Sequence, residues 1–312
     1  MESDDKRAGY RIHDLIDVIF SIATTISLIT TGVALGTKSV SGFTMWLCIT
    51  LGIALIAAVF TAIRLGRVSM NRFKAFSIQF HKFTELMRDN YYDLENKQAK
   101  GELTIPYITE RMKETLKDSL DYLCRILNAS TGKEINACIK VLLLNQYDET
   151  VLNEDNAYVK TLCRDRNSDS TREVSQIKHK VFENTDFNKI LFEECPDNCF
   201  YSGNLKAYSS NLVKTGQIYK NSDKYWSRHY IGTIVCPIRI KNQYLHYKAI
   251  DDDYYVIGFL CVDSKSPDAF REQEPYKRYN MNTVKAFADG IFTFLEKCSF
   301  FLDKAADRSN IK

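Results

Sequence analysis

Two uncharged apolar runs occupy the first quarter of the chain, from Val18 to Leu35 and from Phe43 to Ile63. At a rise of about 1.5 Å per residue, helices over these runs would be about 27 and about 31 Å long, close to the hydrocarbon thickness of a bilayer. The pattern therefore predicts a two-helix transmembrane hairpin within an N-terminal region of residues 1–66. A cleaved signal peptide is the alternative for the first run, but that run is long, and Asp14 and Asp17 precede it.

Basic residues flank this predicted hairpin at both ends, whereas the link between the two spans carries only Lys38. By the positive-inside rule, both termini are expected in the cytoplasm, with two spans in a bacterial inner membrane or a plasma membrane. The lipid bilayer is thus an expected partner. The flanking basic residues are Lys6, Arg7, Arg11, Arg64, Arg67, Arg72 and Lys74.

The first run is rich in hydroxyl side chains that would share one face of a helix. Such a face suits close helix packing in lipid, and Gly32 and Gly36 add a GxxxG spacing. A pore lined by several copies is the alternative, but neither run contains the ionisable residue that usually marks an ion path. The hydroxyl residues predicted on this membrane face are Ser21, Thr24, Thr25, Ser27 and Thr31.

An apolar stripe at spacings of three and four follows the second run and predicts a helical stalk over residues 67–100. Two partners for the stripe remain open: a second copy of the chain, giving a homo-oligomer through the stalk and the terminal helices, or the helix's own domain. A polar segment with Gly101, followed by Pro106, then marks a domain boundary. The stripe consists of Phe73, Phe76, Phe80, Phe83, Met87 and Leu94.

Helical and strand patterns alternate over the rest of the chain. A helix is expected from Tyr107 to about Leu127, before Gly132, and another over Val284 to Leu302. Between them lies a long irregular middle, with a short helix expected at 186–194. The order predicts an α+β domain with a central antiparallel sheet flanked by terminal helices. The expected strands are Asn136–Leu144, Ala157–Arg164, Gly232–Lys241 and Tyr254–Asp263.

The segments TIVCPIRI and VIGFLCVDS, joined by a polar loop and followed by the helix NTVKAFADGIFTFLEKC, resemble the closing half of a GAF domain. Glycine early in the second strand would allow a bulge or a close approach, and Pro237 would lie at a strand irregularity. The resemblance places a GAF-like sensor domain at residues 101–304, followed by a polar tail at 305–312. Other PAS-like or profilin-like sensor folds would suit the same pattern.

The resemblance implies a ligand pocket between the sheet and the segment Asn184–Tyr230. Aromatic and basic residues there could stack on a base and pair with a phosphate or carboxylate, although aromatic side chains in loops often serve local packing. Arg164, at a strand end, is a separate candidate for anion binding. The asparagine–lysine signature of GAF domains that bind cyclic nucleotides is not evident. The predicted ligand-binding residues are Arg164, Tyr201, Tyr225, Trp226, Arg228 and His229.

Charge and cysteine content narrow the classes of function. A net charge of +3 with no long basic block argues against binding of a nucleic-acid polymer. Nine scattered cysteines indicate a reducing compartment, and Cys195 with Cys199 lacks the second pair of ligands that a zinc site needs. No phosphate loop, GxSxG or HExxH motif is present, so we expect no metal, no cofactor and no catalysis.

Two hypotheses for function follow. The first is a membrane-anchored sensor that binds a small, nucleotide-like ligand and signals to the hairpin, an architecture similar to effectors of bacterial defence systems. The second is a membrane-anchored scaffold that dimerises or binds a protein without any ligand.

Overall fold

The structure is a computed structural model that describes residues 40–144, 157–168, 177–192, 198–241 and 254–310. The chain divides into two compact units, Met1–Asn71 and Arg72–Lys312. Helix α2 (Val40–Ala99) contributes residues to both units. The first predicted span, with its hydroxyl face, lies outside the described residues, and so does the loop before β6.

In the first unit, α2 carries the second predicted span. Several of its large apolar side chains are exposed, at helical spacings of three and four. Over the described part of the chain, no helix is apolar enough over a sufficient length to cross a membrane, so the structure lends the predicted hairpin no support. The exposed apolar residues are Ile49, Ile53, Ile56, Val59, Phe60 and Ile63.

The second unit is built on an antiparallel sheet with the strand order β3-β2-β1-β6-β5-β4. The four strands expected from the sequence are confirmed as β1, β2, β5 and β6. The other two strands are too short to show a period-two pattern. The strands are β1 (Asn136–Leu144), β2 (Ala157–Arg164), β3 (His179–Lys180), β4 (Phe200–Ser202), β5 (Gly232–Lys241) and β6 (Tyr254–Ser264).

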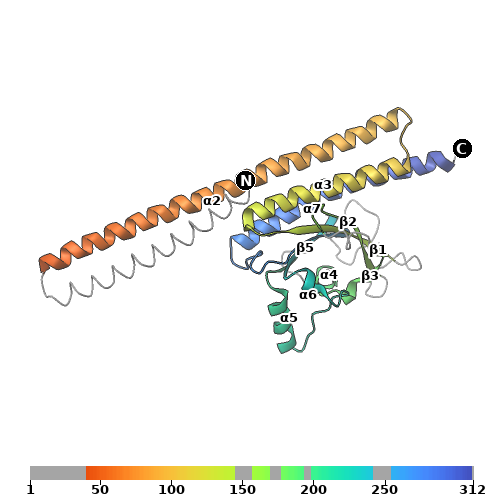
Figure 1. Cartoon of the computed structure of the whole chain (residues 1–312). Helices are drawn as coiled ribbons and strands as arrows, with labels where there is room; N and C mark the ends of the chain where they lie inside the picture. Colours follow the sequence, from red (N-terminus) through yellow and green to blue (C-terminus); the bar gives the residue numbers. More distant parts are fainter. Residues whose placement is uncertain (1–39, 145–156, 169–176, 193–197, 242–253, 311–312) are drawn as a thin grey trace. The chain divides into compact units, whose positions relative to one another are not determined.

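Two long helices, α3 (Ile105–Thr131) and α7 (Tyr276–Asn310), cover one face of this sheet (Figure 1). Thr104 caps α3 by accepting a hydrogen bond from the Tyr107 amide, and Gly132 ends the helix at a φ of 68°. The apolar residues of both helices and of this sheet face form one core. The prediction of an antiparallel sheet flanked by terminal helices is therefore confirmed.

The stripe on α2 belongs to this same core. Phe83 and Leu94 are fully buried, and the ring of Phe83 stacks on Phe287 of α7 with centroids 4.3 Å apart. The stripe thus packs against its own domain through these residues. Phe73 is 66% exposed, so part of the stripe remains uncovered.

The other face of the sheet is covered by short helices and loops, which form a second core. The pattern predicts only α4 here; the remaining elements are short and carry no clear periodicity. The helices are η2 (Val181–Glu183), α4 (Thr185–Phe192), α5 (Leu205–Lys214) and α6 (Trp226–His229).

Candidate functional site

A cavity of about 320 Å³ lies between the second face of the sheet and the segments around α4 and α6. Its floor is formed by strands β1, β2, β5 and β6, and its walls by His179 of β3, the start of α4, the 221–223 loop and the end of α6. Most of the lining side chains are polar. They include Lys140, Thr161, Arg164, His179, Asn184, Asp186, Asn221, Ser222, Asp223, His229, Tyr230, Thr233 and Asp263, with Cys138 and Cys261.

The ladder of the sheet fixes the order of the floor residues. Cys138 of β1 lies opposite Arg164 on one side and opposite Cys261 on the other. Asp263, two residues beyond Cys261, lies opposite Thr233 of β5. Because residues two apart in a strand share a face, these side chains converge from four strands on one surface.

Arg164 is the last residue of β2. Only 8% of this residue is exposed, so it is the most enclosed cation of the site. Burial alone would lower the pKa of its guanidinium, but the negative forms of Cys138 and Asp263 outweigh that cost and raise the pKa. Arg164 therefore stays charged inside the cavity. A guanidinium held in this way can bind a carboxylate or phosphate through two parallel hydrogen bonds.

Asp186 provides a buried acid across the cavity from the sheet. Burial raises the pKa of its carboxyl to about 6, although the Phe187 amide, which donates to Oδ1 at 3.0 Å, and Lys140 both lower it. Its first-turn position on α4 also favours the carboxylate. Near neutral pH this group can accept a hydrogen bond from a ligand, and at lower pH it can donate one.

Lys140 interrupts the apolar run of β1 and reaches into the same cavity. Its ammonium donates to Thr161 Oγ1 at 3.4 Å and lies 5.8 Å from the centroid of the Phe187 ring. Burial, and then Lys140, lower the pKa of His179, which keeps that imidazole neutral. The cavity thus has fixed charges of both signs together with neutral hydrogen-bonding groups.

Side-chain amides hold the segments that close the cavity. Asn184 donates from Nδ2 to the carbonyl oxygen of Lys180 at 2.9 Å, and its Oδ1 accepts from the amide and hydroxyl of Ser222 at 3.1 and 3.0 Å. Asn221 donates to the hydroxyl of Tyr230 at 2.7 Å. These bonds connect the start of α4 to the loop before α6, so the two segments form one continuous wall.

The structure brings two of the residues predicted from the sequence, Arg164 and His229, into this cavity. Nε2 of His229 lies 3.6 Å from Oδ2 of Asp223 at the rim. Trp226 instead packs in the second core, with its ring centroid 5.2 Å from that of Tyr219.

The remaining predicted residues lie elsewhere. The guanidinium of Arg228 stacks 4.4 Å from the Tyr225 centroid, and both side chains are exposed. Tyr201 packs against the first core, on the opposite face of the sheet, and donates its hydroxyl to the carbonyl oxygen of Arg271 at 2.7 Å. Whether any of these six residues touches a ligand stays a prediction.

Four charged residues of the cavity escape sequence reasoning: Lys140, Asp186, Asp223 and Asp263. Lys140 and Asp263 lie far apart in the chain and line the same cavity because β1 pairs with β6. A signal for Lys140 does exist, because a lysine within NACIKVLLL is a charge on a strand that otherwise reads as buried.

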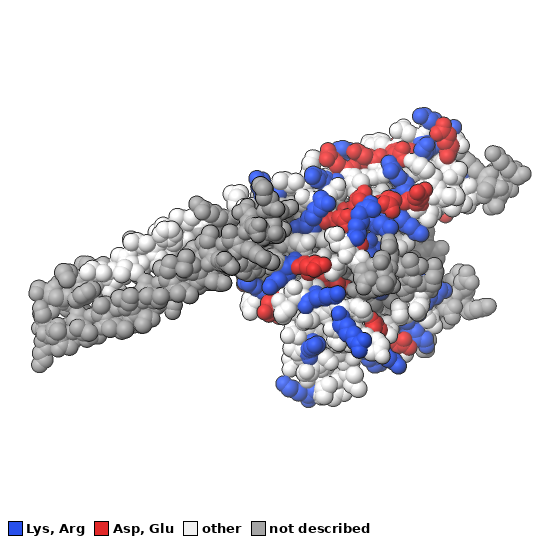
Figure 2. All heavy atoms as spheres, viewed as in Figure 1, with Lys and Arg blue, Asp and Glu red and all other residues white. Residues whose placement is uncertain are grey.

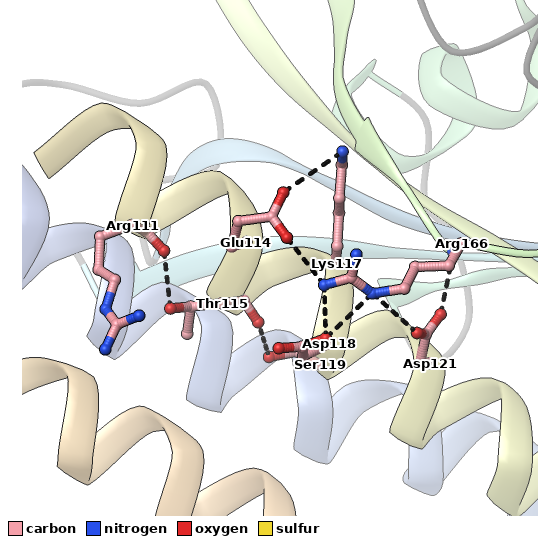
Figure 3. A network of polar contacts seen from close by, with 8 residues as sticks. All are labelled: Arg111, Glu114, Thr115, Lys117, Asp118, Ser119, Asp121 and Arg166. Atoms are coloured by element: carbon pink, nitrogen blue, oxygen red, sulfur yellow. Dashed lines mark hydrogen bonds and ion pairs between the residues drawn. The ribbon is translucent and has the colours of Figure 1, made fainter. Parts of the chain in front are cut away.

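A second polar cluster anchors the end of β2 to α3 (Figure 3). The guanidinium of Arg166 lies 2.8 Å from Glu114 Oε2 and 2.8 Å from Asp118 Oδ1, and the Arg166 amide donates to Asp121 Oδ1 at 3.0 Å. The hydrogen bond from Arg166 lowers the pKa of Glu114, whereas burial raises that of Asp121. Arg166 is two residues from Arg164, so the cavity floor and α3 are joined by a short segment.

The outer surface of the described residues carries both charge signs. In Figure 2, Lys and Arg alternate with Asp and Glu over the face in view, and neither sign forms a continuous field there.

Comparisons with known proteins concern the fold. No family model matches the chain, and no curated protein matches it. Solved structures of GAF domains are similar to it. The GAF domain of an Acinetobacter phosphoenolpyruvate-protein phosphotransferase is 10% identical, with 67% of this chain and 92% of that chain covered at a TM-score of 0.36. The corresponding Coxiella burnetii GAF domain is 12% identical, with coverage of 70% and 96% and a TM-score of 0.37.

Proposed function

We propose that the domain is a sensor that binds a small polar molecule in the cavity between the sheet and the segments around α4 and α6. One observation carries this proposal: a space of about 320 Å³ is lined by buried charged groups of both signs. That volume falls in the range of small-molecule sites. Burying several charges is costly, and a ligand that pairs with them would recover part of that cost.

The chemistry of the lining indicates the kind of ligand. An anionic group, such as a phosphate or carboxylate, would bind between Arg164 and Lys140. A group with N–H donors, such as a nucleobase edge or an amine, would face Asp186. A nucleotide-like molecule meets both requirements, in agreement with the ligand class expected from the sequence.

Signalling would run from the cavity floor to the helices. In this proposal Arg164 contacts the ligand. Arg166 follows two residues later and binds the carboxylates of Glu114 and Asp118 on α3. Since α3 packs beside α7 in the first core, a shift at the end of β2 would reach the helical layer. A ligand can shift the helical layer from one arrangement to another only if it binds the second arrangement more tightly than the first.

We also propose that the two apolar runs anchor the sensor to a membrane with both termini in the cytoplasm. The uncharged sequences of Val18–Leu35 and Phe43–Ile63 support this anchoring, together with the exposed apolar side chains on α2. In the defence-effector version, ligand binding makes the hairpin damage the membrane. Cells that produce the full chain would then lose membrane potential when the ligand is supplied, and an unchanged potential would exclude that version.

The sensor proposal is tested by thermal unfolding of the full chain in detergent against a panel of mononucleotides, cyclic nucleotides, dinucleotides and amino acids. A ligand at a hundred times its dissociation constant should stabilise the domain by about 2.7 kcal/mol, a shift of a few degrees. The Arg164→Gln variant should lose about half of that shift or more, whereas Arg228→Gln should keep it. If no compound shifts the folded protein and sedimentation shows self-association, the ligand-free scaffold replaces the sensor.

A further inference from the structure

Two of the cysteines lie side by side on the floor of the cavity. Cys138 of β1 and Cys261 of β6 are direct partners in the antiparallel ladder, and both side chains line the cavity. Facing residues in such a ladder have Cα atoms about 4.5 or about 5.5 Å apart, depending on the type of pair. Both separations fall within the range of about 4.4–6.8 Å in which a disulfide can form.

The two thiols also interact with each other and with a cation. Cys261 is hydrogen-bonded to Cys138, and this bond, after burial, raises the pKa of the Cys261 thiol. The Arg164 guanidinium interacts electrostatically with both sulfurs, since their negative forms help to raise its own pKa. Lys140 favours the Cys261 thiolate, but burial outweighs it, and the pKa stays well above its ordinary value. What distinguishes this pair is its position on the floor of the cavity.

A second thiol pair provides an internal comparison. Cys199 and Cys236 are also hydrogen-bonded to each other and are buried, but in the apolar first core between the sheet and the long helices. Neither residue is part of the lining of the cavity. Both pairs have cations nearby, Lys140 for Cys261 and Lys285 with Arg239 for Cys236. The two pairs therefore differ in their access to a small polar molecule.

We propose that Cys138 and Cys261 are an oxidation site at which hydrogen peroxide entering the cavity converts the two thiols into a cross-strand disulfide. One thiol gives up its proton as its sulfur attacks the O–O bond and becomes a sulfenic acid, and the departing hydroxide takes up that proton as water. The other thiol then attacks the sulfenic sulfur, forms the S–S bond and expels the second water. The two sulfurs lose two electrons in total, and these reduce the peroxide.

This inference does not depend on the identity of a ligand, since the thiols line the cavity in the protein as it stands. It assigns a consequence to oxidation, however. The disulfide would link β1 to β6 and remove two ionisable neighbours of Arg164, so binding of an anion at that guanidinium would change with the redox state.

The test is peptide mapping of the full chain after treatment with hydrogen peroxide, alkylation of the remaining thiols and digestion without reductant. We expect a disulfide-linked pair of peptides containing Cys138 and Cys261 that dithiothreitol separates, while Cys199 and Cys236 are recovered alkylated. Recovery of Cys138 and Cys261 as alkylated thiols, or oxidation of both pairs at the same rate, would overturn the proposal.

Single substitutions give a second readout. In Cys138→Ser, the sulfenic acid on Cys261 has no partner and should be trapped by dimedone, whereas Cys199→Ser should still form the linked peptides. If Cys138→Ser does not fold, mapping of the unsubstituted chain still decides the matter. Because mapping does not involve a ligand, its failure would leave the sensor proposal standing, and a failed ligand screen would not affect the thiol result.

Discussion

The ring of Phe83 on α2 occupies the space that a side chain at position 290 of α7 would need. A Cβ built on Gly290 would lie 2.6 Å from both Cε1 and Cζ of Phe83, and Phe83 is only 1% exposed. The ring cannot move away into solvent, so the fit of α2 on α7 depends on the missing side chain.

Gly290→Ala should therefore lower the free energy of unfolding by about 1–3 kcal/mol, although alanine favours a helix more than glycine does. Urea unfolding followed by circular dichroism measures this change. Gly66→Ala, also in a helix but with open space around its Cβ, should be neutral or slightly stabilising. Phe83→Ala should cost about 3–5 kcal/mol by itself. In the Phe83→Ala background the cost of Gly290→Ala should vanish, and an additive double variant would contradict the proposed clash.

The buried carboxyl of Asp186 predicts a pH dependence of stability. Its pKa rises from an ordinary value of 3.8 to about 6 on folding, so the folded chain binds a proton more tightly than the unfolded chain between these values. Stability from this group is thus full below about pH 4 and falls as the pH rises through about 6. The total loss is about 3 kcal/mol, because each pKa unit corresponds to about 1.4 kcal/mol.

In Asp186→Asn, the side-chain oxygen can still accept a hydrogen bond from the Phe187 amide, but the side chain cannot ionise. The variant should be more stable than the unsubstituted chain at pH 7.5, by up to about 3 kcal/mol, and this advantage should shrink at pH 4.5. Asp89→Asn, at a side chain of α2 that is 67% exposed, serves as the control for the loss of a carboxylate. Equal stability differences at both pH values would show that Asp186 does not titrate as its burial predicts.

Replacement of Arg164 tests the cation of the cavity. Arg164→Gln should weaken binding of the compound that gives the largest thermal shift by about tenfold to a hundredfold, the value of one hydrogen bond to a charged group. Isothermal titration calorimetry measures the affinity, and circular dichroism verifies the fold. Arg164→Lys should recover only part of the affinity, because an ammonium lacks the planar fork of a guanidinium. Unchanged affinity in Arg164→Gln would place the ligand elsewhere.

The Arg166 cluster should contribute modestly to stability, because 46% of the Arg166 side chain is exposed to solvent. Arg166→Gln should lower the free energy of unfolding by about 1 kcal/mol at low salt, and less in 1 M NaCl, since screening weakens exposed ion pairs. Arg278→Gln removes a single exposed pair with Glu274 and should have almost no effect. If Arg166 carries the signal, Arg166→Gln should also alter the response of the helices to the ligand while the ligand still binds.

Much of the fold follows from local patterns. The four longer strands, α3 and α7 are visible in the sequence because each buries a regular face, with period two in a strand and 3.6 in a helix. The ends of α3 are also local, since Thr104 and Gly132 supply the cap and the left-handed turn. In contrast, α5, α6, β3 and β4 are short and are held by contacts with the rest of the second unit, so no periodicity marks them.

The site depended on tertiary structure for a different reason. The sequence indicated Arg164 as an anion-binding candidate. The alternation of residues along a strand separates its two faces, but it does not show which face lines the cavity. Tyr201 lies in the segment expected to form the pocket, yet it is directed to the opposite face, whereas its neighbour Phe200 packs in the second core. A shift of one residue in a strand reverses the face that a side chain occupies.

Elements that repeat a buried pattern, the two uncharged runs and the basic residues around them can be identified from the sequence, because each depends on residues that are neighbours in the chain. Strand pairing and helix packing were needed to show that Lys140, Asp186 and Asp263 line one cavity, that Cys138 faces Cys261, and that the α2 stripe packs on α7. These relationships arise from strand order and ladder register, which bring together residues more than a hundred positions apart, such as Cys138 and Cys261. Local propensity carries no information about such pairings, because their free energy is gained only when the whole sheet and its covering helices assemble.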